Sequence, residues 1–167
     1  MKFLTRSKLV LALTTAGTLL LSHNVSADYR VTAFGEATAY NALMSADAET
    51  AKSIFARKSV AKLDFTALNN LCVTQILSSE YTAAIATCKS ALEDVETDLT
   101  IPSATEKAAK ADILSNMAVA KVMSGDLAGA VTDIELAASL DGYDRNVSSN
   151  YELISAKRLP VEIASGI

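Results

Sequence analysis

The stretch "NNLCVTQILSSEYTAAIATC", residues 69–88, combines a helical-hairpin pattern with both cysteines of this 167-residue chain. Apolar or small residues recur at helical spacing before residue 78 and again after residue 80, and polar residues separate the two runs. The stretch therefore predicts two antiparallel helices joined by a tight turn. Cys72 and Cys88 lie at similar distances from that turn, each on the apolar stripe of its helix.

The hairpin pattern returns 46 residues further along the chain. Residues 70–73 (NLCV) correspond to residues 116–119 (NMAV), and the turn at 78–81 (SSEY) corresponds to 124–127 (SGDL). Such an internal repeat decides the architecture, because each helix pair buries its apolar face against the next pair.

This pattern resembles the tetratricopeptide repeat (TPR), a helix pair of about 34 residues. The matching repeats cover about residues 65–98 and 111–144. The resemblance implies an all-α fold of TPR-like antiparallel helix hairpins that form a short, irregular α-solenoid with capping helices. The family's early aromatic residue and closing proline are missing from both repeats, and twelve extra residues separate them. The residues at the motif positions are Leu71, Cys72, Tyr81, Ala84, Cys88 and Ala91, then Met117, Ala118, Leu127, Ala130, Ile134 and Ala137.

The chain before and between the two repeats carries weaker signals. Residues 45–58 resemble a degenerate half repeat in which Ala51 and Phe55 take the buried positions. Residues 28–44 show no regular period, and we expect an irregular N-terminal segment there. Between the repeats, residues 103–106 (SATE) predict a capping box at the start of the next helix.

A terminal helix is predicted over residues 146–157, where apolar residues follow a helical spacing. A repeat array needs such a capping helix with one polar face at its open end. This helix would complete a helical domain over residues 45–159. Pro160 should end it, and residues 160–167 should form a tail.

The first 27 residues have the pattern of an export signal. A basic stretch precedes a 13-residue apolar run at 9–21, and small residues precede Asp28, so cleavage is expected between Ala27 and Asp28. The run is shorter than the ~20 residues of a membrane-spanning helix, which favours a signal peptide over an anchor. The expected localisation is periplasmic or secreted, with no stable membrane anchor after cleavage.

The composition of residues 28–167 excludes several functions. Three of the 15 basic residues and none of the 19 acidic residues lie in the signal, which leaves 12 basic against 19 acidic residues. Such an acidic chain is a poor binder of nucleic acid. The single histidine, His23, also lies in the signal, so histidine-based catalysis is absent from the rest of the chain. We expect no catalytic residue, no cofactor and no metal site.

Cys72 and Cys88 are predicted to form a disulfide between the two helices of the first hairpin. They should lie at one level of the hairpin, and an exported protein folds in an oxidising compartment. Two buried thiols remain the alternative, because Ala118 and Ile134 take the same places in the second repeat. A zinc site needs about four ligands, and a thioredoxin-type redox pair needs closer spacing.

The inner face of the first helix in each repeat is the expected partner-binding surface, as the TPR resemblance implies. Thr66 and Asp112 lie on this face as well, and none of its positions is basic. Either a protein or peptide partner binds there, or a terminal segment of the same chain covers the face. The expected partner-binding residues are Asn69, Val73, Ile76, Leu77, Ser115, Val119, Val122 and Met123.

These observations favour a non-enzymatic protein that acts in protein–protein interaction or scaffolding in the cell envelope. A structural or self-associating helical module with a buried concave face is the alternative, and a homo-oligomer would fit it. A small-ligand binder or an enzyme is less favoured, because the chain offers no convergent pair of carboxylates.

Overall fold

The computed structural model describes residues 29–158, and all regular structure within that range is helical. The predicted signal at 1–27 and tail at 160–167 lie outside the described residues. No helix between residues 29 and 158 is long and apolar enough to cross a membrane. The elements are α1 (Tyr40–Met44), α2 (Ala48–Phe55), the 3-10 helix η1 (Val60–Lys62), α3 (Phe65–Leu77), α4 (Tyr81–Thr97), α5 (Ser103–Ser124), α6 (Leu127–Asp141) and α7 (Arg145–Arg158).

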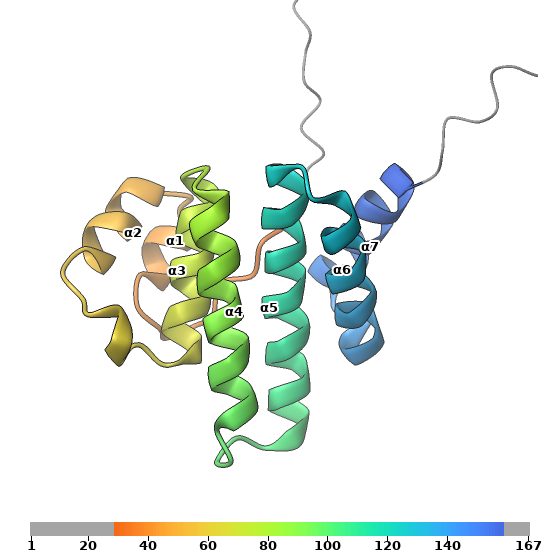
Figure 1. Ribbon diagram of the computed structural model, residues 1–167. Helices are drawn as coiled ribbons and strands as arrows, with labels where there is room; N and C mark the ends of the chain where they lie inside the picture. The colour runs from red at the N-terminus through yellow and green to blue at the C-terminus, as the bar shows by residue number, and fades with distance from the viewer. Residues whose placement is uncertain (1–28, 159–167) are drawn as a thin grey trace, which may run out of the picture.

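The helices form a row, with α1 and α2 at one end and α7 at the other (Figure 1). The hairpins α3/α4 and α5/α6 make up the middle of the row, and α4 packs against α5. Residues 29–39 contain neither helix nor strand. The short helix α1 follows them, inside the segment that the sequence predicts to be irregular up to residue 44.

Local capping and turn residues define the first hairpin. The Asp64 carboxylate accepts a hydrogen bond from the backbone N–H of Ala67 at 2.9 Å and so caps the N-terminus of α3. The hydrogen bond from the Thr66 hydroxyl, together with this one, lowers the pKa of Asp64. Helix α3 ends at Leu77 with Ser78 as its C-cap, and Ser79 takes a left-handed conformation with φ 60° that reverses the chain into α4.

The second hairpin has stronger turn chemistry. Gly125 ends α5 with φ 94°, a backbone conformation that glycine adopts without strain. Asp126 caps α6 by accepting a hydrogen bond from the Gly129 N–H at 2.9 Å. The predicted capping box at residues 103–106 is wrong: α5 begins at Ser103, but Pro102 occupies the N-cap position and no side chain caps the helix.

Alanines fill the places where neighbouring helices approach closely. The larger buried residues Ile113, Ile134 and Ile154 occupy the space between them. Ala51 and Phe55 of α2 are buried, as the sequence pattern predicts. The alanines with no exposed surface in the two central hairpins are Ala84, Ala91, Ala118, Ala120, Ala130 and Ala137.

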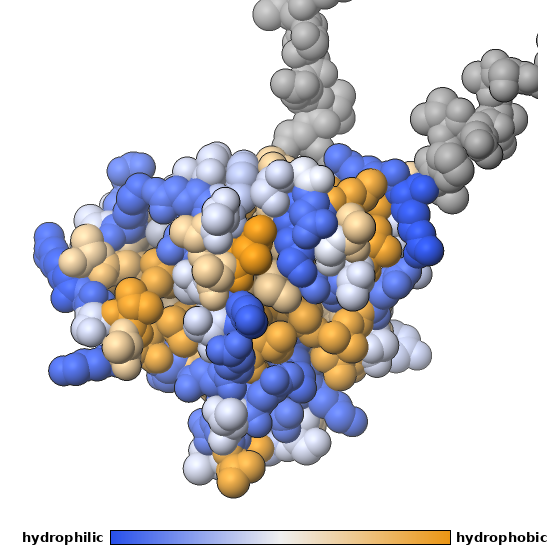
Figure 2. Space-filling model, in the orientation of Figure 1, coloured by the Kyte–Doolittle hydropathy of each residue, from blue (hydrophilic) through white to orange (hydrophobic). Residues whose placement is uncertain are grey.

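The outer face over α4, α5 and α6 mixes apolar with charged residues (Figure 2). The loop between α4 and α5 projects from the body and carries an apolar tip, where Leu99 is 96% exposed. At the far end of the row, Val147 and Ile154 bury one face of α7, while Tyr151 stays 40% exposed.

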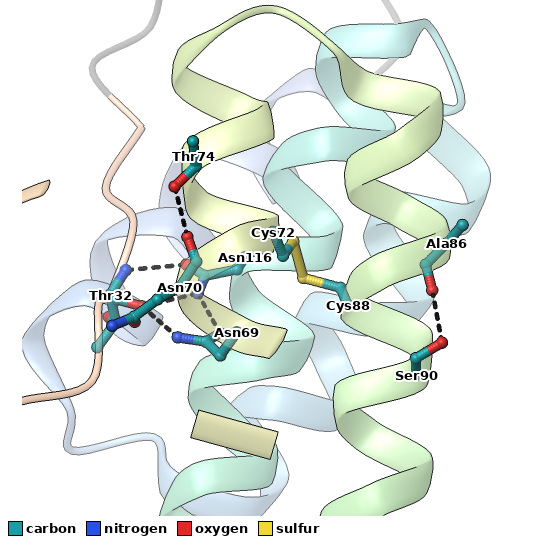
Figure 3. Close-up of a disulfide and its surroundings, with 9 residues drawn as sticks. All are labelled: Thr32, Asn69, Asn70, Cys72, Thr74, Ala86, Cys88, Ser90 and Asn116. Atoms are coloured by element: carbon teal, nitrogen blue, oxygen red, sulfur yellow. Dashed lines mark hydrogen bonds between the residues drawn. A yellow bond between two sulfur atoms is a disulfide. The ribbon is translucent and has the colours of Figure 1, made fainter. Parts of the chain in front are cut away.

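A disulfide between Cys72 and Cys88 joins α3 to α4 (Figure 3). The two Cα atoms are 5.4 Å apart, and neither residue has exposed surface. The predicted pairing is therefore confirmed, and the described residues contain no free cysteine.

Replacing both cysteines tests how much this bond contributes. We expect Cys72→Ala/Cys88→Ala to lower the free energy of unfolding by about 3 kcal/mol, because the bond closes a short loop in the unfolded chain. The helical content should be unchanged, since Ala118 stands at the place of Cys72 in the second hairpin. Urea denaturation followed by circular dichroism measures both quantities. An unchanged denaturation midpoint would contradict the expectation.

Candidate functional site

Residues 29–34, here called the N-terminal segment, cross the inner helices α7, α5 and α3 in that order. The segment is the first part of the described chain and belongs to no helix or strand (Figure 1). Its backbone therefore needs hydrogen-bond partners other than those of a helix or a sheet.

Three asparagines, here called the asparagine clamp, supply these partners. Asn150 of α7, Asn116 of α5 and Asn70 of α3 each hold one residue of the segment. Each side-chain amide accepts from a backbone N–H and donates to the carbonyl oxygen of the same residue. The bonds accepted from the backbone N–H groups of Arg30, Thr32 and Phe34 have N···O distances of 2.9, 2.9 and 2.7 Å. The bonds donated to the carbonyl oxygens of the same residues have N···O distances of 2.7, 2.9 and 2.9 Å.

The clamp therefore forms hydrogen bonds with the backbone of every second residue, as expected for an extended chain. In an extended backbone, the N–H and C=O of one residue point to the same side, and alternate residues repeat that direction. An asparagine amide presents its oxygen and one of its two N–H groups in a matching arrangement, so it pairs with such a residue as a neighbouring strand would. One asparagine on each of three adjacent helices then holds residues 30, 32 and 34.

A second set of polar side chains supports the clamp. Asn69 donates to the Thr32 carbonyl oxygen at 2.9 Å and accepts from Asn116 at 2.9 Å (Figure 3). The Ser115 hydroxyl oxygen accepts from Asn150 at 2.9 Å. The three clamp asparagines have no exposed surface, so their paired amides fix the segment in one register.

The side chains of the segment also have specific contacts. Val31 and Ala33 pack against the cluster around Val73, and the Phe34 ring meets Phe65 edge-on at 6.1 Å. At the other end, the Lys157 ammonium lies 5.5 Å from the centre of the Tyr29 ring. The groove therefore matches the side chains of this segment as well as its backbone.

An acidic side chain lies beside the middle of the segment. Asp112 is one helical turn before Asn116 on α5, so both face the segment. Burial, and then the negative charge of Asp144, raise the pKa of Asp112 to about 7, while the Thr32 hydroxyl opposes the shift. Thr32 also accepts a hydrogen bond from Asn146 at 3.0 Å.

The predicted partner-binding residues fall into two groups. Asn69 and Ser115 lie at the clamp and are buried, and Val73, Ile76 and Val119 are buried among apolar side chains. Their inner face is therefore covered by the chain itself. The remaining three residues lie towards the ends of α3 and α5 and keep exposed surface: Leu77, Val122 and Met123.

Sequence reasoning missed the residues that hold the segment. Asn70 and Asn116 recur at the same place in the two repeats, which signals the repeat but not the role of the side chains. Asn150 lies in the terminal helix and has no repeat partner in the pattern. An asparagine that recurs in an apolar stripe could have indicated this role, because a buried amide must find hydrogen-bond partners.

No other arrangement within residues 29–158 competes with this site. These residues contain no cluster of three potential metal ligands. Asp133 also has a pKa raised by burial, but Lys121 pairs with it at 2.6 Å and opposes the shift. No protein-family model, curated protein or solved structure matches this chain.

Truncation of the central clamp residue should loosen the segment. Asn116→Ala leaves the Thr32 N–H and the Asn69 side-chain amide oxygen without partners, so we expect a loss of about 2–4 kcal/mol in unfolding free energy. Hydrogen exchange at the Thr32 amide should accelerate in parallel. Asn41→Ala removes an exposed asparagine side chain and serves as the matched control. Equal effects of the two substitutions would contradict the role of the clamp.

Asp112 should make stability depend on pH. Its pKa is about 7 in the folded chain and near 3.8 when unfolded, so the folded state binds the extra proton between about pH 4 and pH 7. Stability therefore falls as the pH rises through that window. Asp112→Asn should raise the melting temperature at pH 8 and change it little at pH 4.

The control for this measurement is Glu93→Gln, which removes an exposed carboxylate on α4. It should shift the melting temperature by a similar small amount at both pH values. A melting-temperature gain for Asp112→Asn that is the same at pH 4 and pH 8 would contradict the assignment.

Proposed function

We propose that this chain is an exported, TPR-like helical repeat protein that binds extended peptide segments and has no catalytic role. The binding surface is the groove that α3, α5 and α7 form around the N-terminal segment. The observation that carries the proposal is the asparagine clamp, in which one amide per helix pairs with both backbone groups of every second segment residue.

The class of ligand follows from these contacts. Because the clamp bonds only backbone atoms of the segment, it accepts any extended peptide without proline at the clamped positions. Side-chain preference comes from the spaces that Val31 and Phe34 occupy now, which suit apolar residues. The fitting ligand is an extended segment with apolar side chains, the conformation that proteins add to exposed sheet edges in strand addition.

Two further observations support the repeat and export parts of the proposal. The hairpins α3/α4 and α5/α6 place Asn70 and Asn116 at equivalent positions, so the repeated unit and the repeated contact coincide. The buried disulfide suits a protein that folds in an oxidising compartment. Both agree with a binding module in the cell envelope.

A purely structural role of the N-terminal segment is the second candidate. The segment covers Val73 and completes a small cluster with Leu43 and Ala51, as a permanent cover would. The two candidates differ in one property: a binding groove accepts a second peptide when its own segment is weakened, and a permanent cover does not.

Proline at the position of Thr32, introduced either in the chain or in an added peptide, separates the two candidates. Thr32→Pro in the chain removes the N–H that Asn116 accepts, and should open the groove. A labelled peptide of residues 29–34 should then bind the variant about tenfold or more tightly than the native chain. The reason is that each 1.4 kcal/mol by which the docking of the attached segment is weakened raises the fraction of chains with an open groove about tenfold. Fluorescence anisotropy measures the binding.

The matched controls use the same position. Thr32→Val keeps the N–H that Asn116 accepts and loses only the hydroxyl contacts with Asn146 and Asp112, so it should open the groove less than Thr32→Pro does. A peptide with proline at the position of Thr32 should not bind. Circular dichroism must show equal helicity of all chains. A peptide that binds neither the native chain nor the Thr32→Pro variant would assign the segment to the structural role.

A further inference from the structure

We infer that the partner of the groove is a second copy of this chain, through reciprocal exchange of residues 29–34 between two molecules. Each copy would place its N-terminal segment in the asparagine clamp of the other. The inference rests on the proposed function, because it requires a groove that can take a segment from another molecule.

The fit between groove and segment selects this occupant. Backbone contacts alone would accept many peptides, but four side-chain contacts match this sequence in particular. They are the Tyr29 ring at Lys157, Val31 and Ala33 at Val73, Thr32 at Asn146, and Phe34 at Phe65. A segment with the same sequence comes from another copy of the chain, and it would form every one of these contacts unchanged.

The connection behind the segment favours exchange. Residues 35–39, here called the hinge, turn the chain back from the groove into α1. Glu36 has φ 59° and Ala39 has φ 64°, a left-handed conformation that is unfavourable for residues with a side chain. In an exchanged dimer the hinge runs on to the neighbour and no longer needs this turn, so the strain is released.

The hinge is long enough to cross between molecules, and few contacts hold it in the closed chain. Asn70 donates to the Thr38 carbonyl oxygen at 3.1 Å, and Ala39 packs against the cluster around Val73. A methyl group added at Gly35 would meet no other atom within 4 Å, and an open pocket of about 450 Å³ lies beside Glu36, Ala39 and Tyr40. Five extended residues span up to about 17 Å. Reciprocal exchange fills both grooves, so the product is a closed two-fold dimer and not an open chain.

Crosslinking between two chains that each carry one added cysteine tests the exchange. The Thr32 hydroxyl oxygen and the Asn146 amide nitrogen are 3.0 Å apart, so thiols at these two positions lie within reach of a short bifunctional thiol reagent. Thr32→Cys is made in one copy, and Asn146→Cys in a second copy with a larger tag. Both chains begin at Asp28, contain every described residue, and are refolded together at high concentration before crosslinking.

Exchange predicts a crosslinked heterodimer in at least tenfold greater yield than a control pair of Thr32→Cys with Thr100→Cys, an exposed position in the α4–α5 loop. Light scattering should show a dimer before crosslinking. Equal yields from the two pairs would overturn the inference. Glu36→Gly/Ala39→Gly removes the strain from the closed chain and should lower the heterodimer yield. An unchanged yield would overturn the role of the hinge.

The peptide of residues 29–34 distinguishes this inference from the proposed function. Suppression of the heterodimer by excess peptide would support both. If the peptide binds the Thr32→Pro chain but no heterodimer forms, the groove binds peptides and the exchange is refuted. If neither occurs, the proposed function fails as well.

Discussion

A backbone N–H or C=O group that is buried away from water needs a hydrogen-bond partner. The N-terminal segment lies on a surface made of helices, and the helices must supply these partners. Helices α3, α5 and α7 have used their own backbone groups internally, so only side chains can serve the segment. Asn70, Asn116 and Asn150 each direct the amide oxygen and one N–H at the same segment residue, in the spacing of alternate residues. Without these amides, five backbone groups of the segment would lose their only partner on a largely apolar face, and the Thr32 carbonyl oxygen would keep only Asn69.

The rest of the fold positions the three amides. Alanines at the helix crossings let the hairpins approach closely, and the Cys72–Cys88 bond holds α3 against α4. Asn69 and Ser115 then orient the clamp by hydrogen bonds at 2.9 Å. A rigid frame matters here, because an amide that pairs with two backbone groups at once tolerates little displacement. The frame and the clamp therefore belong to one physical arrangement.

The contacts around the segment also contain opposing contributions. Asp112 lies against Thr32 with a pKa raised to about 7, so its charge is unfavourable beside the docked segment at high pH. Glu36 and Ala39 hold the hinge in a left-handed conformation. Both features make the docked segment less stable than its hydrogen bonds alone would suggest. A segment held this way suits a groove that exchanges its occupant, as the proposed binding and self-association require.

The amino-acid sequence by itself determined the helical class, the two hairpins and the cysteine pair. These features depend on local spacing: apolar residues at helical intervals, the turns at Ser79 and Gly125, and cysteines equidistant from one turn. Only the tertiary structure decided what covers the inner face. The pairing of Arg30 with Asn150 joins residues 120 positions apart, and no local pattern encodes such a contact. An asparagine in an apolar stripe shows that a polar partner must exist, but the fold alone brings that partner into place.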